Sequence, residues 1–300
     1  MAVRRRIELE VASRINAGWS DRVHCIELSR IGFGDGESAL KMEVVPREVM
    51  NKALFLYGTF EISETRLVQT FLRPGMTVVD VGANIGYYTL IAAKVVGPSG
   101  SVHSFEPNSD VRTRLERNVK LNEFHNVVVH DQAMTRRSGD IRFYVSAVPE
   151  NSGISSIVPG SGLDAEGESV PCTSLDDFVA GLPGGRIDLL KMDIEGAELD
   201  VIEGGRKTLG AANAPALLFE SFGVSPLLVA LRGLGYHVRR LHYTLRDGLE
   251  LPEAEDPSDS LFAEYESPNY FAVKDVGRFD SLIAEVNASR SPIFGHLGRL

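Results

Sequence analysis

Cysteine and tryptophan are scarce in this chain, whose 300 residues include two cysteines and one tryptophan. Cys25 and Cys172 lack the short spacing of metal-binding pairs, and two cysteines are too few for a disulfide framework. The scarcity is typical of a protein in a reducing compartment. We expect both thiols to be buried.

Long apolar runs and an excess of positive charge are also missing. No hydrophobic stretch approaches the roughly 20 residues that a transmembrane helix needs. Arg4, Arg5 and Arg6 are not followed by an apolar segment, so we expect no signal peptide. The net charge of −10 disfavours a nucleic-acid or anionic-membrane surface and is compatible with a cationic partner. We expect a cytoplasmic protein that binds neither nucleic acid nor a membrane.

What the chain does have is a regular alternation of apolar strands and helices from residue 77 onward. We predict strands at 77–82, 101–105, 127–134, 187–194 and 216–221, with helices at 64–71, 87–96, 110–121 and 197–209 and a further helix ending at 234. Nearly continuous apolar strands are typical of a parallel sheet with helices on both faces. An extra strand is predicted at 140–146, and 237–243 with 269–274 predict a late hairpin at the sheet edge.

The first part of the chain lacks this alternation. Predicted strands at 23–31 and 39–45 flank a glycine-rich turn, which indicates a small hairpin. We therefore divide the chain into an N-terminal cap, residues 1–55, and a main domain, residues 56–300. Residues 147–169 form a loop rich in Gly, Ser and Pro whose length favours a functional lid.

The most informative motif is the Gly-x-Asn-x-Gly turn after the first strand of this alternation, formed by Gly82, Asn84 and Gly86. Such a turn lets backbone approach a ligand closely. Its spacing differs from the Gly-x-Gly-x-x-Gly of dinucleotide-binding folds. Asp80, at the strand end, would repel a pyrophosphate but attract the ammonium and sulfonium groups of S-adenosylmethionine. A nicotinamide oxidoreductase is therefore disfavoured.

Three further positions are candidates for binding the rest of such a cofactor. Glu106 ends the second strand, 24 residues after Gly82, where a carboxylate accepts hydrogen bonds from ribose hydroxyls. Asp131 and Gln132 follow the third strand; they alternate in facing, so we expect only one of them to meet the ligand. Glu61, just before the first βα unit, is expected to reach over the cofactor.

Charged residues also end the apolar strand at 187–194. A strand buried on both faces rarely keeps Lys191 and Asp193 unless they pair or act chemically, and ligands bind beyond such strand ends. Asp193 would orient the reacting group or remove its proton, with Lys191 positioning it or lowering its pKa. Glu195 is the second candidate base, and Glu198 alternatively stabilises the helix N-terminus. Weaker candidates for the pocket wall are Ser155, Ser156 and Glu220.

Together these motifs resemble the FkbM-type methyltransferases, a family of class I S-adenosylmethionine-dependent enzymes. The resemblance covers about residues 55 to 275 and rests on the segments 80–89, 105–107, 173–178, 191–198 and 269–273. It implies a Rossmann-like three-layer α/β sandwich whose seven-stranded, mostly parallel sheet has a final antiparallel strand. It also implies roles for the candidate residues: Asp80, Gly82, Asn84 and Gly86 for the methionine part, Glu106 for the ribose, Asp131 or Gln132 for the adenine, and Lys191, Asp193 and Glu195 facing the acceptor.

We accordingly expect methyl transfer to a hydroxyl oxygen of a small molecule, a sugar or natural-product scaffold, with Asp193 as first candidate base. The sequence offers no closed set of metal ligands, so no metal is expected. The segment 250–266 has seven acidic residues and no Lys or Arg, which favours a cationic acceptor. N-methylation of an amine, a cofactor-binding subunit without turnover, and a homodimer remain alternatives.

Overall fold

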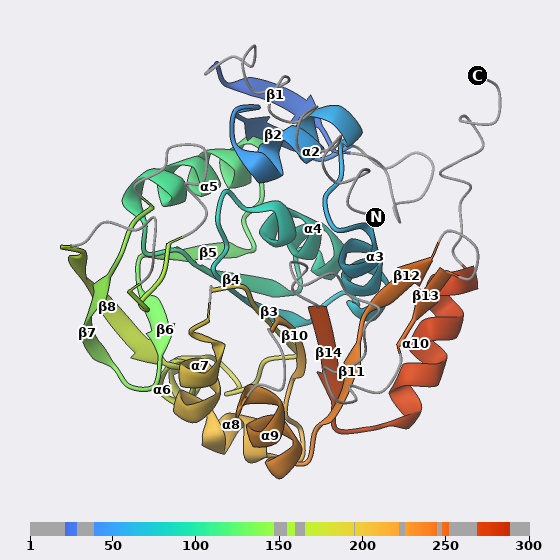
Figure 1. Cartoon of the computed structure of the whole chain (residues 1–300). Coiled ribbons are helices and arrows are strands. Elements are labelled where there is room, and N and C mark those ends of the chain that lie inside the picture. The colour runs from blue at the N-terminus through green and yellow to red at the C-terminus, as the bar shows by residue number, and fades with distance from the viewer. Residues whose placement is uncertain are drawn as a thin grey trace, which may run out of the picture.

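A seven-stranded sheet forms the centre of the computed structural model, which describes residues 22–28, 39–146, 155–159, 166–194, 196–221, 226–244, 248–251 and 269–288 (Figure 1). The strand order is β11-β14-β10-β9-β3-β4-β5. The bounds are β3 (Thr77–Val81), β4 (Ser101–Phe105), β5 (Val127–His130), β9 (Leu189–Met192), β10 (Ala216–Glu220), β11 (His237–Arg240) and β14 (Asn269–Val273). The five strands from β10 to β5 are parallel, whereas β14 pairs antiparallel with both β10 and β11. The predicted mostly parallel sheet with a late antiparallel strand is confirmed.

Helices cover both faces of this sheet, so the fold is the predicted three-layer α/β sandwich (Figure 1). One face carries α3 (Ile62–Phe71), α4 (Tyr87–Val96), α5 (Ser109–Leu121) and α10 (Gly277–Ala288). The other carries α6 (Leu175–Gly181), α7 (Glu198–Gly204), α8 (Arg206–Gly210) and α9 (Pro226–Gly233). Successive strand residues such as Val78 and Val79 enter different hydrophobic clusters, because side chains alternate across a sheet.

The chain is less regular at two places than the apolar pattern predicts. The strand expected at 127–134 is two strands, β5 and β6 (Ala133–Thr135), and β6 belongs to a separate sheet with β7 (Gly139–Phe143) and β8 (Glu168–Ser174). The helix expected at 197–209 is interrupted between α7 and α8. Close packing requires glycine at this interruption, since an added Cβ would lie 2.3 Å from the Thr135 carbonyl oxygen at Gly204 and 2.5 Å from Leu175 Cδ2 at Gly205.

The N-terminal cap contains the predicted hairpin, β1 (His24–Glu27) paired antiparallel with β2 (Lys41–Val44), followed by α2 (Val49–Tyr57). Met42, Val44 and Leu54 are buried in the same hydrophobic cluster as residues of α3, α4 and α5. The cap therefore shares a core with the main domain.

One prediction about the cysteines is wrong. Cys172 is buried, but Cys25 is exposed. In the short strand β1, exposed residues alternate with half-buried ones, and Cys25 lies on the exposed face. A residue in a two-stranded edge hairpin can thus remain accessible although cysteine is on average among the most buried residue types.

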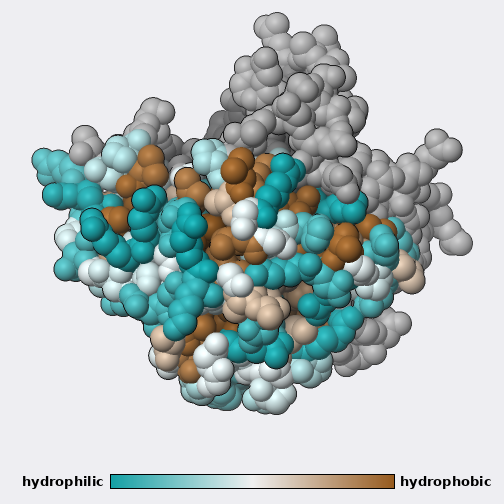
Figure 2. Space-filling view, turned by 90° about the horizontal axis from the view of Figure 1, so that it is seen from below, coloured by the Kyte–Doolittle hydropathy of each residue, from teal (hydrophilic) through white to brown (hydrophobic). Residues whose placement is uncertain are grey.

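A small hairpin, β12 (His242–Thr244) with β13 (Gly248–Glu250), precedes the acidic segment, of which residues 252–266 lie outside the described residues. Figure 2 shows mainly hydrophilic side chains with small, separate hydrophobic groups on the described part of the face that lies at the bottom of Figure 1. Within the described ranges, no helix has both the length and the apolar character needed to cross a membrane.

Candidate functional site

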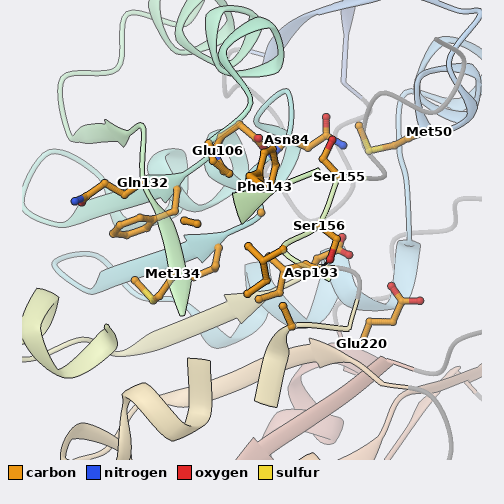
Figure 3. A pocket seen from close by; sticks show the side chains of 18 of the residues that line it. Met50, Asn84, Glu106, Gln132, Met134, Phe143, Ser155, Ser156, Asp193 and Glu220 are labelled. Atoms are coloured by element: carbon orange, nitrogen blue, oxygen red, sulfur yellow. Dashed lines mark hydrogen bonds between the residues drawn. The ribbon is translucent and has the colours of Figure 1, made fainter. Parts of the chain in front are cut away.

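A cavity of about 280 Å³ lies beyond the carboxyl ends of β3, β4, β9 and β10. Its wall includes Val81, Phe105, Asp193 and Glu220, which end or follow these four strands. In the view of Figure 3, Asn84, Glu106 and Met50 lie on one side, Asp193 and Glu220 on another, and Gln132 and Met134 at the far end. Parallel strands bring their ends to one sheet edge, which is where open α/β sheets bind ligands.

The glycine turn between β3 and α4 forms the floor of this cavity. Gly82 has φ +76°, and a Cβ added there would lie 2.0 Å from the Asp193 carbonyl oxygen. The Asp193 backbone N–H donates to the Val81 carbonyl at 3.1 Å, so the loop after β9 is held directly against the turn. Gly82 and Asn84 line the cavity. Gly86 does not line it; its missing side chain makes room for Leu115 of α5.

Glu106 is a buried carboxylate in the cavity wall. One oxygen accepts the Asn84 backbone N–H and the other the Asn108 backbone N–H, both at 3.0 Å. Burial raises the pKa of Glu106 to about 7, although these two hydrogen bonds act in the opposite direction. Asn108 also caps α5, so the carboxylate is tied to both the turn and the helix start.

Of the two candidates after β5, Gln132 lines the cavity, whereas Asp131 is exposed and lies outside the described lining. Phe105, Met134 and Phe143 add apolar surface to the same cavity. This arrangement suits a flat ring with polar edges.

Asp80 and Lys191 lie beneath the cavity, and neither belongs to its described lining. They are register partners on β3 and β9, with the Lys191 Nζ 3.8 Å from the Asp80 carboxylate. The Thr89 hydroxyl donates to Asp80 at 2.7 Å. The sequence predicts that Asp80 contacts the cofactor; in the structure its carboxylate is buried between Thr89 and Lys191.

Lys191 links this buried layer to the cavity. Its Nζ lies 3.5 Å from the carboxylate of Asp193, which lines the cavity with 41% of its side chain exposed, and 4.8 Å from the centre of the Tyr88 ring. Burial acts to lower the pKa of Lys191, but the carboxylates of Asp193, Asp80 and Glu61 outweigh it, so the pKa is raised. The site therefore keeps a fixed cation behind Asp193.

Glu61 lines the cavity from the segment before α3. It occupies the N-cap position in a left-handed conformation, φ +42°, but its side chain does not cap the helix. The carboxylate instead accepts the Tyr88 hydroxyl at 2.7 Å. Burial and the neighbouring Glu64 raise the pKa of Glu61 to about 7.

The remaining candidates divide clearly. Ser155, Ser156 and Glu220 line the cavity as expected. The Ser156 backbone pairs with Tyr144, and its hydroxyl reaches the Ile194 carbonyl at 3.5 Å, which connects this strip to the loop after β9. Glu198 accepts the backbone N–H groups of Ile194 and Gly196, a structural role. Glu195 lies outside the described residues.

Sequence reasoning missed several lining residues. They share an origin outside the ends of the central-sheet strands: Glu48, Met50, Asn51 and Phe60 come from the cap and its link to α3, Phe143 from β7, and Ile157 from the segment 155–159. No motif marks them, because they reach the cavity through contacts between segments distant in sequence.

Comparison with known proteins shows which family the chain belongs to. The model of the family described as "Methyltransferase FkbM domain" matches residues 80–238, more than half of the chain. The chain belongs to the FkbM methyltransferase family. The matched region holds the glycine turn, Glu106, Gln132 and Asp193, while Asn51 and Glu61 lie outside it.

Three curated relatives of this FkbM family member are methyltransferases by name. "Methyltransferase 1" of Beauveria bassiana is 25% identical over 182 residues, 55% of this chain and 69% of that protein. "31-O-demethyl-FK506 methyltransferase FkbM" of Streptomyces tacrolimicus is 29% identical over 161 residues, 44% and 60% of the two chains. "Hexuronic acid methyltransferase AglP" of Haloferax volcanii is 29% identical over 134 residues, 45% and 52%. The matches thus span little more than half of the latter two proteins.

A solved structure of an FkbM methyltransferase from Methylobacillus flagellatus KT aligns with 67% of this chain and 44% of its own, at 19% identity and a TM-score of 0.43.

Proposed function

We propose that this FkbM family member transfers a methyl group from S-adenosylmethionine to a hydroxyl oxygen of a small molecule, a sugar or natural-product scaffold. The observation that carries the proposal is a single cavity lined by three features. They are the glycine turn, the buried carboxyl group of Glu106, and Asp193 with the Lys191 ammonium 3.5 Å from its carboxylate. The names of two relatives, a hexuronic acid methyltransferase and a 31-O-demethyl-FK506 methyltransferase, support an oxygen acceptor.

The lining residues fit such a cofactor. Gly82 lines the cavity with backbone alone, and Glu106 presents two carboxylate oxygens in the cavity wall. Glu106 would hold the ribose hydroxyls, Gln132 with its apolar neighbours the adenine, and the segment from Gly82 to Asn84 the methionine part. When bound, the cofactor supplies an electrophilic methyl group.

The chain's own residues would then position the acceptor and remove its proton. Displacement at a methyl carbon needs the nucleophile aligned about 3–3.5 Å away and water excluded. Asp193 would accept the proton of the acceptor hydroxyl, since its carboxylate reaches the cavity and Lys191 fixes its position. Glu195 stays the second candidate base. Asp80 would balance the charge of Lys191.

An amine acceptor is the second candidate function, and the charges of the cavity favour it. The described lining contains five carboxyl groups, those of Glu48, Glu61, Glu106, Asp193 and Glu220, and no Lys, Arg or His. A cationic acceptor would be attracted to such a surface. An acceptor screen that pairs neutral sugars with their amino analogues separates O- from N-methylation, and loss of turnover in EDTA restored by Mg²⁺ would add a metal.

The proposal is tested by calorimetric titration of the whole protein with S-adenosylhomocysteine and, in parallel, NAD⁺. We expect micromolar binding of S-adenosylhomocysteine alone. Glu106→Gln should weaken it, whereas Glu116→Gln, an exposed carboxylate on α5, should not. Binding of NAD⁺ alone would overturn the proposal, and binding of neither would favour a protein without enzymatic activity.

A further inference from the structure

Asn51 of α2 is a polar residue that the motifs did not single out. Its side chain is fully buried and lines the cavity. The amide nitrogen donates to Oε2 of Glu48, one helical turn earlier. The amide oxygen, Oδ1, has no hydrogen-bond partner in the structure.

The orientation of this amide follows from its neighbours. Arg114 of α5 donates to both carboxylate oxygens of Glu48, at 2.6 and 3.0 Å, so both oxygens act as acceptors. Only the NH₂ end of Asn51 can face an acceptor, which turns Oδ1 the other way. A buried acceptor without a partner is unfavourable, and native proteins seldom keep one without a reason. A ligand group that donates a hydrogen bond would supply that reason.

We propose that Asn51 binds the cofactor: its Oδ1 accepts a hydrogen bond from a hydroxyl or ammonium group of bound S-adenosylmethionine. The inference rests on the proposed function, because it takes the cavity to be the cofactor site. It adds a ligand contact from the cap, outside the matched residues 80–238.

The contacts of the cap favour the cofactor over the acceptor as the source of the donor. The side chain of Asn118, on α5, accepts the Glu43 backbone N–H at 2.7 Å and donates to the Ile85 carbonyl at 2.8 Å. The cap is thereby fastened to the glycine turn.

Two more links place the cap and its connection to α3 over the same side. Arg114, which holds Glu48, belongs to the helix that begins just after Glu106. The Tyr87 hydroxyl, in the first turn of α4, lies 3.1 Å from the Thr59 hydroxyl and accepts the Phe60 backbone N–H. These partners belong to the turn, α4 and α5, whereas Asp193 and Glu220 belong to the ends of β9 and β10.

The test is calorimetric titration of the whole protein and its Asn51→Leu variant with S-adenosylhomocysteine. Loss of one buried hydrogen bond should weaken binding about tenfold. Gln69→Leu is the matched control: Gln69 Oε1 is likewise buried without a partner, but Gln69 lies on α3 outside the described lining, so its affinity should equal that of wild type. Wild-type affinity in Asn51→Leu would overturn the inference.

Further measurements keep the result interpretable. If Asn51→Leu does not melt cooperatively, Asn51→Ala, which cannot overfill the site, is titrated instead, with the same two outcomes. A loss that also appears with 5′-methylthioadenosine, which lacks the amino-acid part, assigns the donor to the ribose; a loss with S-adenosylhomocysteine alone assigns it to the ammonium, and either supports the inference. If wild type itself binds no S-adenosylhomocysteine, it is the proposed function that fails.

Discussion

At the scale of single residues, two aspartates near one lysine have different environments. Asp80 is buried beneath the cavity with Thr89 and Lys191, whereas Asp193 reaches into the cavity from the end of β9. Charge at the strand end was readable from the sequence, but the depth of each carboxylate was not, because depth depends on how β3 and β9 pair. Asp193 is thus better placed than Asp80 to meet a reacting group.

Replacing Asp193 with Asn should separate chemistry from binding. We expect kcat to fall about 10²- to 10⁴-fold, the range for loss of a general base, with S-adenosylhomocysteine affinity nearly unchanged. The measurement is transfer of labelled methyl to the acceptor that the screen identifies. Asp200→Asn serves as the control, because Asp200 on α7 pairs with Arg136 at the surface. A fully active Asp193→Asn enzyme would remove Asp193 from this role.

The alternation of side chains along a strand indicated that only one of Asp131 and Gln132 faces the ligand. It could not show which of the two does. The sequence showed that Asp131 and Gln132 face opposite ways, and the structure adds that Gln132 is the one that lines the cavity. The choice is made by the path of the chain as it leaves β5 for β6, in a different sheet. A local pattern of apolar residues does not encode that change.

At the scale of elements, the glycine turn and the loop after β9 depend on each other. Gly82→Ala would place a Cβ 2.0 Å from the Asp193 carbonyl oxygen at φ +76°, so backbone must move. We expect the free energy of unfolding to fall by roughly 3 kcal/mol or more and ligand affinity to be lost. Urea unfolding and calorimetry measure the two effects.

Gly97→Ala is the matched control for that substitution. Gly97 also has a positive φ, +63°, but nothing lies within 4 Å of an added Cβ. Only the conformational cost of its backbone region, roughly 1–3 kcal/mol at φ +63° and ψ −174°, should appear, with ligand affinity retained. Equal losses in the two variants would show that backbone strain, not the close approach of the β9 loop, explains Gly82.

Most elements of the central sheet were predictable, since buried parallel strands are nearly continuous apolar runs. The bounds of α4 and β4 agree with the sequence prediction residue for residue. The cavity wall from α2 was not predictable in the same way. The side chain of Asn51 is oriented by Glu48, and that of Glu48 by a contact with Arg114, which lies more than 60 residues later in the chain. A local sequence pattern does not reveal such a contact.

At the scale of the whole molecule, folding places the carboxyl groups of Glu61 and Glu106 in buried surroundings that disfavour their ionisation. The pKa values of Glu61 and Glu106 are raised from 4.5 to about 7, chiefly by burial. Below pH 4.5 each is protonated in both states, and its contribution to stability is fully present. As pH rises, the unfolded chain ionises first, so stability is lost up to about pH 7.

Stability should therefore fall between about pH 4.5 and pH 7, and Glu106→Gln should reduce that fall by up to about 3 kcal/mol. Urea unfolding at several pH values measures the slope. Glu116→Gln, which changes an exposed carboxyl group on α5, should keep the wild-type slope. An unchanged slope in Glu106→Gln would contradict a raised pKa at this position.

The place of β14 between β10 and β11 has a consequence for the chain during synthesis. Residues 216–220 are made long before residues 269–273, yet β10 takes its outer partner from β14, and β11 joins the described sheet only through β14. Until the later residues leave the ribosome, β10 presents an open edge that includes Leu217 and Phe219. Such an edge invites pairing with another chain, so the nascent protein is most exposed to aggregation just before its last strand is made.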